Sequence, residues 1–415
     1  MNLLSASATS DVAMIIIDIA IILLAGLIMG RLAEKIKIPA VTGYLVAGLV
    51  IGPVLGLVKD LEHYHIISNI ALGFIAFQVG NELWLGKLKK TGGKIVVITI
   101  IQAVATTGLV IALILPFAST SIALVLGAIA AATAPAPIMM IVKKYRTKGE
   151  LTDTLLPVVG LDDAVGVILF GVLLSIAVSL MSSTGEVLTF IELVKEPAIE
   201  IGYSIAIGTF VGVATGIALK TIDNDHERKE KNLHVVIIAV FVTTGLAMYF
   251  HASPILTPMI AGAFVTNLIN KECYRTEEHT IVEFIPPLMI LFFTIAGAEL
   301  DFSVLLSVGF IGGAYIVGRI IGKYFGSMLG CRITKSSSNV SKYLGLSLLP
   351  QSGVAIGLSI AAYGAFTAIG TDTGDLAADI VKNVTLAAVL IFELFGPFLV
   401  KMAFTKSGEI RLETE

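Results

Sequence analysis

The stretch "VVGLDDAVGVILFGVLL", residues 158–174, places two adjacent aspartates inside an apolar run that extends over residues 151–181. A charge near the centre of a bilayer costs about 2.5–3.5 kcal/mol on insertion scales. We therefore expect Asp162 and Asp163 to face a hydrated cavity between helices and to act on an ion. A role as helix caps does not fit, because Asp162 lies about three turns inside the run.

The rest of the chain indicates that lipid is its solvent. Of 415 residues, 56% are hydrophobic and only 14% are charged, which predicts an all-α integral membrane protein. Apolar windows of about 20 residues recur along it. They predict thirteen transmembrane helices, at residues 12–30, 39–58, 66–84, 94–116, 120–142, 151–181, 197–220, 233–250, 254–270, 281–300, 303–329, 341–364 and 381–401.

The positions of Lys and Arg predict the orientation of these spans. Of the 28 basic residues, 23 fall in the connections after odd-numbered spans, in the C-terminal tail, or at the span ends that border them. Because cytoplasmic loops are rich in Lys and Arg, we expect the N-terminus outside and the C-terminus in the cytoplasm of a cell-membrane protein. The basic face is thus a topology signal, and no nucleic-acid partner is expected. Cys273 and Cys331 lack metal-ligand spacing and are expected to be reduced thiols.

Internal similarities predict two inverted repeats within a single transport domain, residues 1–415. The segment "IPAVTGYLVAGLV" in span 2 is similar to "SPILTPMIAGAFV" in span 9, and spans 3 and 10 both end with Gly-x-Glu-Leu. Seven spans separate each pair, and this odd number inverts the second copy. We expect repeats at about 12–181 and 233–401, a linker helix at about 197–220 and a short cytoplasmic tail at 402–415.

Glu82 and Glu299 of the two Gly-x-Glu-Leu ends are 299 − 82 = 217 residues apart, and the same offset aligns two helix-breaking segments, "TAPAP" in span 5 and "PQSGV" in span 12. Interrupted membrane helices expose backbone carbonyls, which only protein or a watery cavity can satisfy. We expect spans 5 and 12 to be broken and to cross, rather than to be simply kinked at proline. The crossing would comprise Ala134, Pro135, Pro137, Pro350, Gln351, Ser352 and Gly353.

Oxygen ligands near this crossing indicate a site for a hard cation or a proton. Crowded carboxylates in a poorly hydrated place hold protons more tightly, so that such a group can exchange H⁺ for a small cation. The predicted ligands are Asp163, Asp162 and the hydroxyl of Thr133. No cofactor is expected.

Other charged residues lie within the predicted spans. Arg319 and Lys323 in span 11 are four residues apart and share one helix face, so that both can balance the aspartates, although Lys323 could also reach the cytoplasmic interface. Glu393 in span 13 is either a buried hydrogen-bonding residue or a secondary cation ligand. Asp18 is expected to be an interfacial polar residue.

Together these features resemble the monovalent cation/proton antiporters, in particular their electrogenic Asp-Asp branch. The resemblance covers almost the whole chain and is carried by "IPAVTGYLVAGLVIGP", the "GNEL" end of span 3, the broken span 5, "GLDDAVG" and "GRIIGKYFG". It implies that Asp163 is the principal cation and proton site and that Asp162 pairs with Lys323. It also implies a second buried ion pair, Glu82 with Arg319.

The resemblance further implies that the transported ions are Na⁺ or Li⁺, with K⁺ as a further candidate, and H⁺. It also implies a homodimer and elevator-type alternating access, with more protons than cations moved per cycle. The chain departs from some relatives in having neutral Gln351 and Ser352 in the second broken helix, which leaves open whether Arg319 or Lys323 neutralises Asp162. We expect no nucleotide-binding regulatory domain, because the sequence ends soon after span 13.

Three other functions are alternatives to cation/proton exchange. The main alternative is a sodium-coupled solute symporter of related fold. An intramembrane aspartyl protease needs two aspartates on different helices, whereas these are contiguous. A passive channel is disfavoured, because opposite charges at one buried pocket favour occlusion over flow.

Overall fold

The computed structural model describes residues 3–36, 38–58, 64–81, 83, 92–182, 190–221, 228–269, 271–300, 309–351 and 353–410. Within these ranges all regular structure is helical. Six described helices are each long and apolar enough to cross a bilayer, at residues 13–35, 93–114, 150–182, 199–221, 232–249 and 372–407. Shorter apolar helices lie at 40–54, 66–81, 120–129, 256–268, 285–298 and 353–367. The number of thirteen spans stays a prediction.

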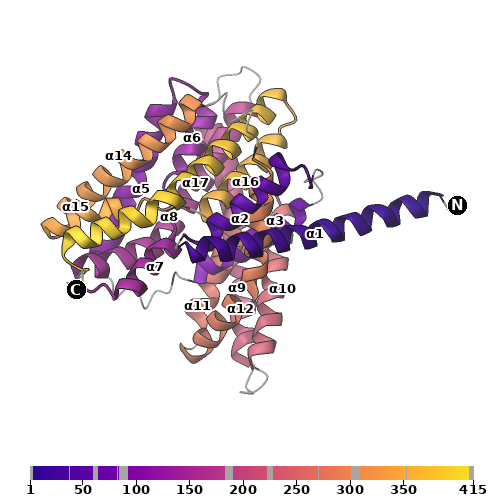
Figure 1. The fold of residues 1–415 in the computed structure, drawn as a ribbon, viewed down its shortest axis with the longest axis horizontal. Coiled ribbons are helices and arrows are strands. Elements are labelled where there is room, and N and C mark those ends of the chain that lie inside the picture. Colours follow the sequence, from indigo (N-terminus) through magenta and orange to yellow (C-terminus); the bar gives the residue numbers. More distant parts are fainter. Residues whose placement is uncertain are drawn as a thin grey trace.

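The helices pack in two groups (Figure 1). The first, here called the core bundle, comprises α5 (Gly93–Ile114), α6 (Thr120–Ile129), α7 (Pro135–Tyr145), α8 (Glu150–Ser182), α14 (Gly309–Ile333), α15 (Ser338–Ser347), α16 (Gly353–Thr367) and α17 (Asp372–Ser407). The second, here called the panel, comprises α1 (Leu3–Lys35), α2 (Ala40–Leu49), the π-helical segment η1 (Val50–Val54), α3 (His65–Asn81), α9 (Phe190–Thr221), α10 (Arg228–Tyr249), α11 (Leu256–Leu268) and α12 (Lys271–Ala298).

Close packing of α5 against α14 determines which residues of the two helices lie side by side at the site. Glycines at every fourth position of α14 face α5, and a methyl group added at Gly322 would lie 2.7 Å from the Cα atom of Thr106. Small residues let two membrane helices approach closely. The stripe, which consists of Gly318, Gly322, Gly326 and Gly330, therefore brings Lys323 of α14 beside α5.

Two membrane helices are interrupted. One stops at Ile129 and resumes at Pro135, and the other stops at Ser347 and resumes at Gly353. Proline is suited to the first turn of a helix, where its missing N–H leaves no hydrogen bond unmade. The two interruptions touch, since the backbone N–H of Ala134 donates to the carbonyl of Pro350 at 2.9 Å. The expected breaks are therefore present and lie against each other, whereas the inversion of two repeats stays a prediction.

Some helix bounds differ from the predicted spans. The second span, expected at 39–58, is α-helical only to Leu49 and continues as η1, in which Pro53 lacks the N–H that an α-helix needs. The last helix begins at Asp372, capped by the hydroxyl of Thr371, and ends at Ser407. It is longer than the apolar span 381–401 because helix continues beyond the apolar residues at both ends.

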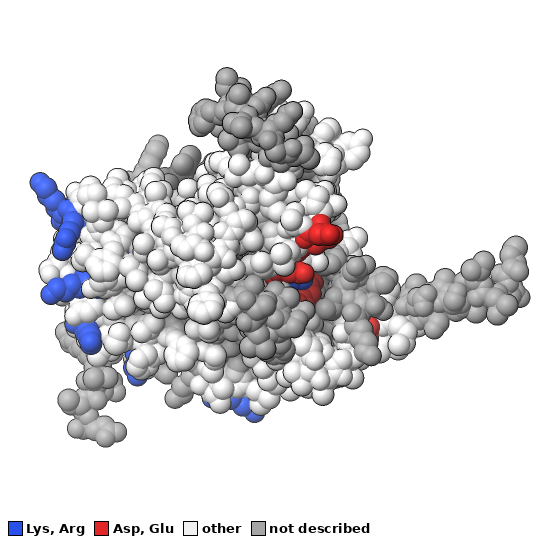
Figure 2. All heavy atoms as spheres, turned by 90° about the horizontal axis from the view of Figure 1, so that it is seen from above, with Lys and Arg blue, Asp and Glu red and all other residues white. Residues whose placement is uncertain are grey.

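Basic side chains gather mainly toward one end of the molecule, and the broad flank seen in Figure 2 is largely uncharged. We call this the basic end. Exposed Lys and Arg lie there in the α7–α8 connection, at the end of α14, in the α14–α15 connection, in the middle of α15 and at the end of α17: Arg146, Lys148, Arg332, Lys335, Lys342 and Lys406. This clustering supports a cytoplasmic basic end, and the orientation itself stays a prediction.

Candidate functional site

The two aspartates of α8 lie in the interior of the protein. Asp162 has no exposed surface and Asp163 is 7% exposed. Adjacent residues of an α-helix point about 100° apart, so the two carboxylates enter different surroundings. Asp162 points into the core bundle, and Asp163 lines a cavity.

Asp162 is held by partners from two other helices. Its Oδ2 atom lies 2.7 Å from Nζ of Lys323 in α14, and neither side chain has exposed surface. Its Oδ1 atom accepts a hydrogen bond from the side-chain amide of Gln102 in α5. Because the lysine supplies the opposite charge and the amide a further donor, the carboxylate is compensated without water.

The two basic residues of α14 also satisfy the interrupted helices. Lys323 donates to the carbonyl of Ala131. The guanidinium of Arg319 donates to four carbonyls, at 2.8 to 3.3 Å, and lies 4.9 Å from the ring centre of Phe392. The C-terminal end of a helix carries partial negative charge, which these cations compensate. The four carbonyls belong to Ala130, Ala132, Leu349 and Pro350.

Neutral side chains complete the crossing. The amide of Gln351 donates to the carbonyl of Ile129 at 3.0 Å, and its nitrogen lies 2.8 Å from the hydroxyl of Tyr315. Thr133 donates its hydroxyl to the carbonyl of Leu348 at 3.1 Å. Polar side chains thus tie each interruption to the other and to α14.

Asp163 borders a cavity of about 190 Å³ between the core bundle and the panel. The core bundle contributes α8, the first interruption and the first turn of α16, and the panel contributes α2, α3 and α12. This places a carboxylate, backbone from two broken helices and the side-chain amide of Gln78 around one space that can hold a small hydrated cation. The lining residues are Val41, Ile75, Gln78, Val79, Ala132, Thr133, Ala134, Pro135, Asp163, Met289, Gly353, Val354 and Ala355.

The structure brings together most of the residues that the sequence singled out. Pro137 is buried in the first turn of α7. Glu393 is buried in α17, where the hydroxyl of Thr42 lies 3.4 Å from its Oε2 atom. Glu82 and Ser352 lie outside the described residues, so the pairing of Glu82 with Arg319 stays a prediction. Asp18 accepts a hydrogen bond from Tyr64 at 3.0 Å.

Sequence reasoning missed Gln102, Tyr315 and Gln78. Each is a polar residue within an apolar span, and a lone amide in lipid is unfavourable unless it finds a partner. That signal could have identified Gln102 and Gln78, although not their partners. Tyrosine gives no such signal, because its largely apolar ring fits an apolar helix.

Comparison with known proteins adds independent findings. The family model described as "Sodium/hydrogen exchanger, transmembrane" matches residues 5–406. The chain is 25% identical over 355 residues to the ammonium/H⁺ antiporter subunit AmhT of Alkalihalophilus pseudofirmus, covering 85% of this chain and 87% of that protein. It is 24% identical over 386 residues to the K⁺/H⁺ antiporter subunit KhtU of Bacillus subtilis, covering 89% of each.

Proteins of Methanocaldococcus jannaschii are similar to the chain in sequence and in fold. The chain is 29% identical over 178 residues to Na⁺/H⁺ antiporter 1 of Methanocaldococcus jannaschii, covering 41% of this chain and 42% of that protein. The structure of the sodium/proton antiporter MjNhaP1 from the same organism, at pH 8, superposes with a TM-score of 0.75 at 21% identity. The superposition covers 95% of this chain and 99% of that one, so the two share their fold.

Proposed function

Because the chain belongs to the sodium/hydrogen exchanger family, we propose that it exchanges a monovalent cation for protons, which compete for Asp163. The family and the named relatives are transporters, so the protein is a membrane transporter rather than an enzyme. One observation carries the assignment of the site: Asp163 borders a cavity between the two helical groups, while Asp162 is already paired with Lys323.

Competition at one carboxylate gives a mechanism of exchange. A cation and a proton cannot occupy the Asp163 carboxylate together, so each must leave before the other binds. The core bundle would carry Asp163 across the membrane in either loaded state, moving against the panel as an elevator. The division of the helices into two groups with the cavity between them supports this movement.

The Asp162–Lys323 pair supplies a route to electrogenic exchange. If cation binding at Asp163 releases a proton from Lys323, two protons move for each monovalent cation and the cycle carries net charge. The proposed cargo is Na⁺ or Li⁺. K⁺ and ammonium are included as candidates, because relatives named for these ions align over most of the chain.

The test is transport in proteoliposomes with an imposed pH gradient and Na⁺, Li⁺, K⁺ or ammonium added in turn. We expect Asp163→Asn to abolish cation-dependent proton movement, and Asp375→Asn, which changes an exposed carboxylate of α17, to leave it intact. Unchanged exchange by Asp163→Asn would overturn the proposal. Because the assay contains no organic solute, exchange also argues against sodium-coupled solute symport.

Competition predicts a specific pH dependence. Lowering the pH on the side of cation binding raises the proton occupancy of Asp163, so the apparent KM for the cation should rise while the maximal rate at saturating cation changes little. Initial rates across a cation series at several pH values measure this. A KM that is independent of pH would contradict competition at one site.

We also infer a homodimer in the cell membrane, with the N-terminus outside and the C-terminus in the cytoplasm. The panel presents apolar residues on its surface, among them Ile16, Ile17 and Leu24 of α1, which suit contact with lipid or with a second copy. Native mass measurement of the detergent-solubilised protein tests the dimer. Labelling of cysteines introduced at each terminus tests the orientation.

A further inference from the structure

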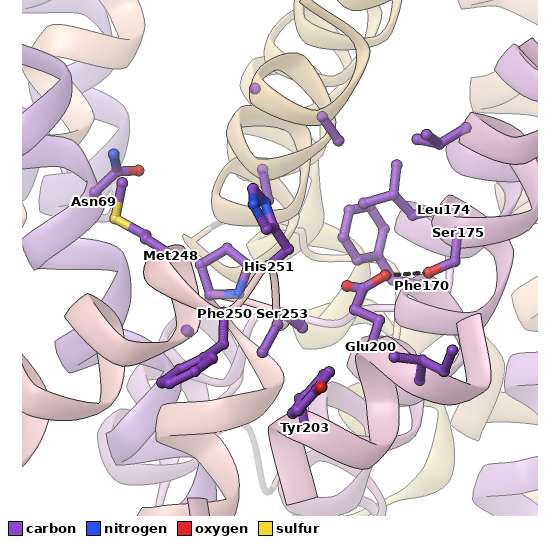
Figure 3. Close-up of a pocket in the computed structure, with 18 of the residues that line it drawn as sticks. Asn69, Phe170, Leu174, Ser175, Glu200, Tyr203, Met248, Phe250, His251 and Ser253 are labelled. Carbon is purple, nitrogen blue, oxygen red and sulfur yellow. Dashed lines mark hydrogen bonds between the residues drawn. The ribbon is translucent and has the colours of Figure 1, made fainter. Parts of the chain in front are cut away.

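A second and larger cavity lies between the core bundle and the panel (Figure 3). Its volume is about 750 Å³. The core bundle lines it with α8 and α16, and the panel lines it with α3, α9, the end of α10 and the α10–α11 connection. Since α8 begins near the basic end, the lining residues Leu174 to Val178 near its other terminus place this cavity at the opposite end of the molecule.

Glu200 gives this cavity its negative charge. Its side chain extends from α9 toward α8, where Ser175 donates a hydrogen bond to the carboxylate (Figure 3). Among the described residues that line the cavity, Glu200 is the only one with a carboxylate. Around it lie mainly apolar and aromatic side chains, including Phe170, Leu174 and Tyr203. A carboxylate among low-dielectric walls attracts cations more strongly than one on an open surface.

The cavity is aligned with the Asp163 site along two helices. Asp163, Phe170 and Leu174 are spaced by seven and four residues, which places them on one face of α8, so the cavity starts about 10 Å along the axis from Asp163. On α16, Gly353 to Ala355 line the Asp163 cavity, and Ile360 to Ala365 include lining residues of this one. The two cavities therefore lie one after the other along the boundary between the core bundle and the panel.

We propose that Glu200 is a cation-binding residue in an entry vestibule, where it recruits monovalent cations from the side opposite the basic end. This inference rests on the proposed exchange at Asp163. The Ser175 hydroxyl holds the carboxylate in place at the boundary between the two helical groups. A cation bound there is concentrated on the same face of α8 that leads to Asp163.

Binding can be tested without transport. In the detergent-solubilised protein, a carbodiimide labels accessible carboxyl groups, and peptide mass spectrometry measures the label at Glu200. Addition of Na⁺, Li⁺, K⁺ or ammonium chloride should lower this label about threefold or more relative to N-methyl-D-glucamine chloride of equal ionic strength. The label at exposed Asp375 should not change. Equal labelling of Glu200 in every salt would overturn the inference.

The same measurement on Asp163→Asn separates this inference from the proposed function. If Glu200 binds cations by itself, added cations still protect Glu200 from the carbodiimide in this variant, although cation/proton exchange is lost. Protection that disappears with Asp163 would show that Glu200 reports only on the Asp163 site, and would overturn an independent vestibule site. Exchange that survives Asp163→Asn would refute the proposed function without affecting protection at Glu200.

Transport from each side supplies the second readout. In vesicles of known orientation at about pH 8, Glu200→Gln should raise the cation KM about 3- to 10-fold from the side opposite the basic end. The KM from the basic end should stay as in the wild type, and Glu200→Asp should recover part of the effect. Equal KM changes from both sides, or none, would contradict the entry role.

Discussion

The two adjacent aspartates of α8 have different surroundings because neighbouring helix residues point in different directions. Asp162 contacts Lys323 and Gln102 in the interior, whereas Asp163 borders a cavity. A fully buried carboxylate with an ion-pair partner is an unsuitable cation ligand, because the lysine already occupies the position that a metal ion would take.

Removing one member of the Asp162–Lys323 pair should destabilise the protein more than removing both charges. Lys323→Met leaves an uncompensated buried carboxylate and should lower the free energy of unfolding by about 3–5 kcal/mol. The double variant Asp162→Asn/Lys323→Met should recover most of that loss. Unfolding in detergent micelles, followed by circular dichroism, measures both. A double variant as unstable as the single one would show that lysine packing, and not charge, is responsible.

At the scale of elements, the site depends on how closely α5 and α14 approach. The glycine stripe of α14 keeps the two backbones close, and Gln102 and Lys323 reach Asp162 from this contact. The interruptions are likewise a property of elements, because their exposed carbonyls create the need for Arg319.

Glycine substitutions on α14 test this packing. Gly322→Ala would place a methyl group 2.7 Å from the Cα of Thr106, a backbone atom, and should destabilise the protein by about 1–3 kcal/mol. The matched control is Gly313→Ala on the same helix, where no atom lies within 4 Å of the added methyl group. That change should be neutral or stabilising, as is usual for Gly to Ala in a helix. Equal thermal stability of the two variants would contradict the packing role.

The first turn of α8 is capped from the end of the chain. The Glu409 carboxylate accepts backbone hydrogen bonds from Leu151 at 2.6 Å and Thr152 at 2.9 Å, and a third from the Thr152 hydroxyl. Negative charge at a helix N-terminus is favourable. Glu409→Ala should therefore lower stability by about 1–3 kcal/mol and speed hydrogen exchange in the first turn of α8. Unaltered hydrogen exchange at the backbone amides of Leu151 and Thr152 would show that the cap does not stabilise this turn.

At the scale of the whole molecule, the core bundle and the panel are joined by an ion pair as well as by apolar contacts. Nζ of Lys382 in α17 lies 3.6 Å from Oε2 of Glu299, which follows α12. The same ammonium lies 4.0 Å from the ring centre of Tyr363. An elevator movement must separate Lys382 from Glu299, because they belong to different groups.

Holding the two groups together at this point should stop exchange. In a Cys273→Ser/Cys331→Ala background, Glu299→Cys/Lys382→Cys treated with a cleavable bifunctional thiol reagent should lose most exchange, and reduction should restore it. Phe117→Cys/Phe310→Cys is the control, because these stacked rings, with centres 6.1 Å apart, both belong to the core bundle. Full exchange by the protein linked at 299 and 382 would refute relative movement of the two groups there.

Much of the fold could be read from local properties of the chain. Hydropathy located the six long apolar helices that the structure describes, and proline, glycine and threonine located both interruptions, because lipid cannot satisfy free backbone groups. Helix ends were less predictable. The bilayer limits the apolar span, whereas α17 continues beyond its own span at both ends, and the π-helical turn at Val50–Val54 depends on one proline within an otherwise regular pattern.

The sequence by itself determined that the chain crosses a membrane, where two helices break, and that Asp162 and Asp163 lie within a span. Each follows from the cost of placing polar groups in lipid, which composition and spacing reveal. Only the tertiary structure decided that Lys323 pairs with Asp162, that Arg319 donates to backbone carbonyls of both interruptions, and that Asp163 borders a cavity. Asp162 and Lys323 are 161 residues apart, so their contact depends on how distant helices pack.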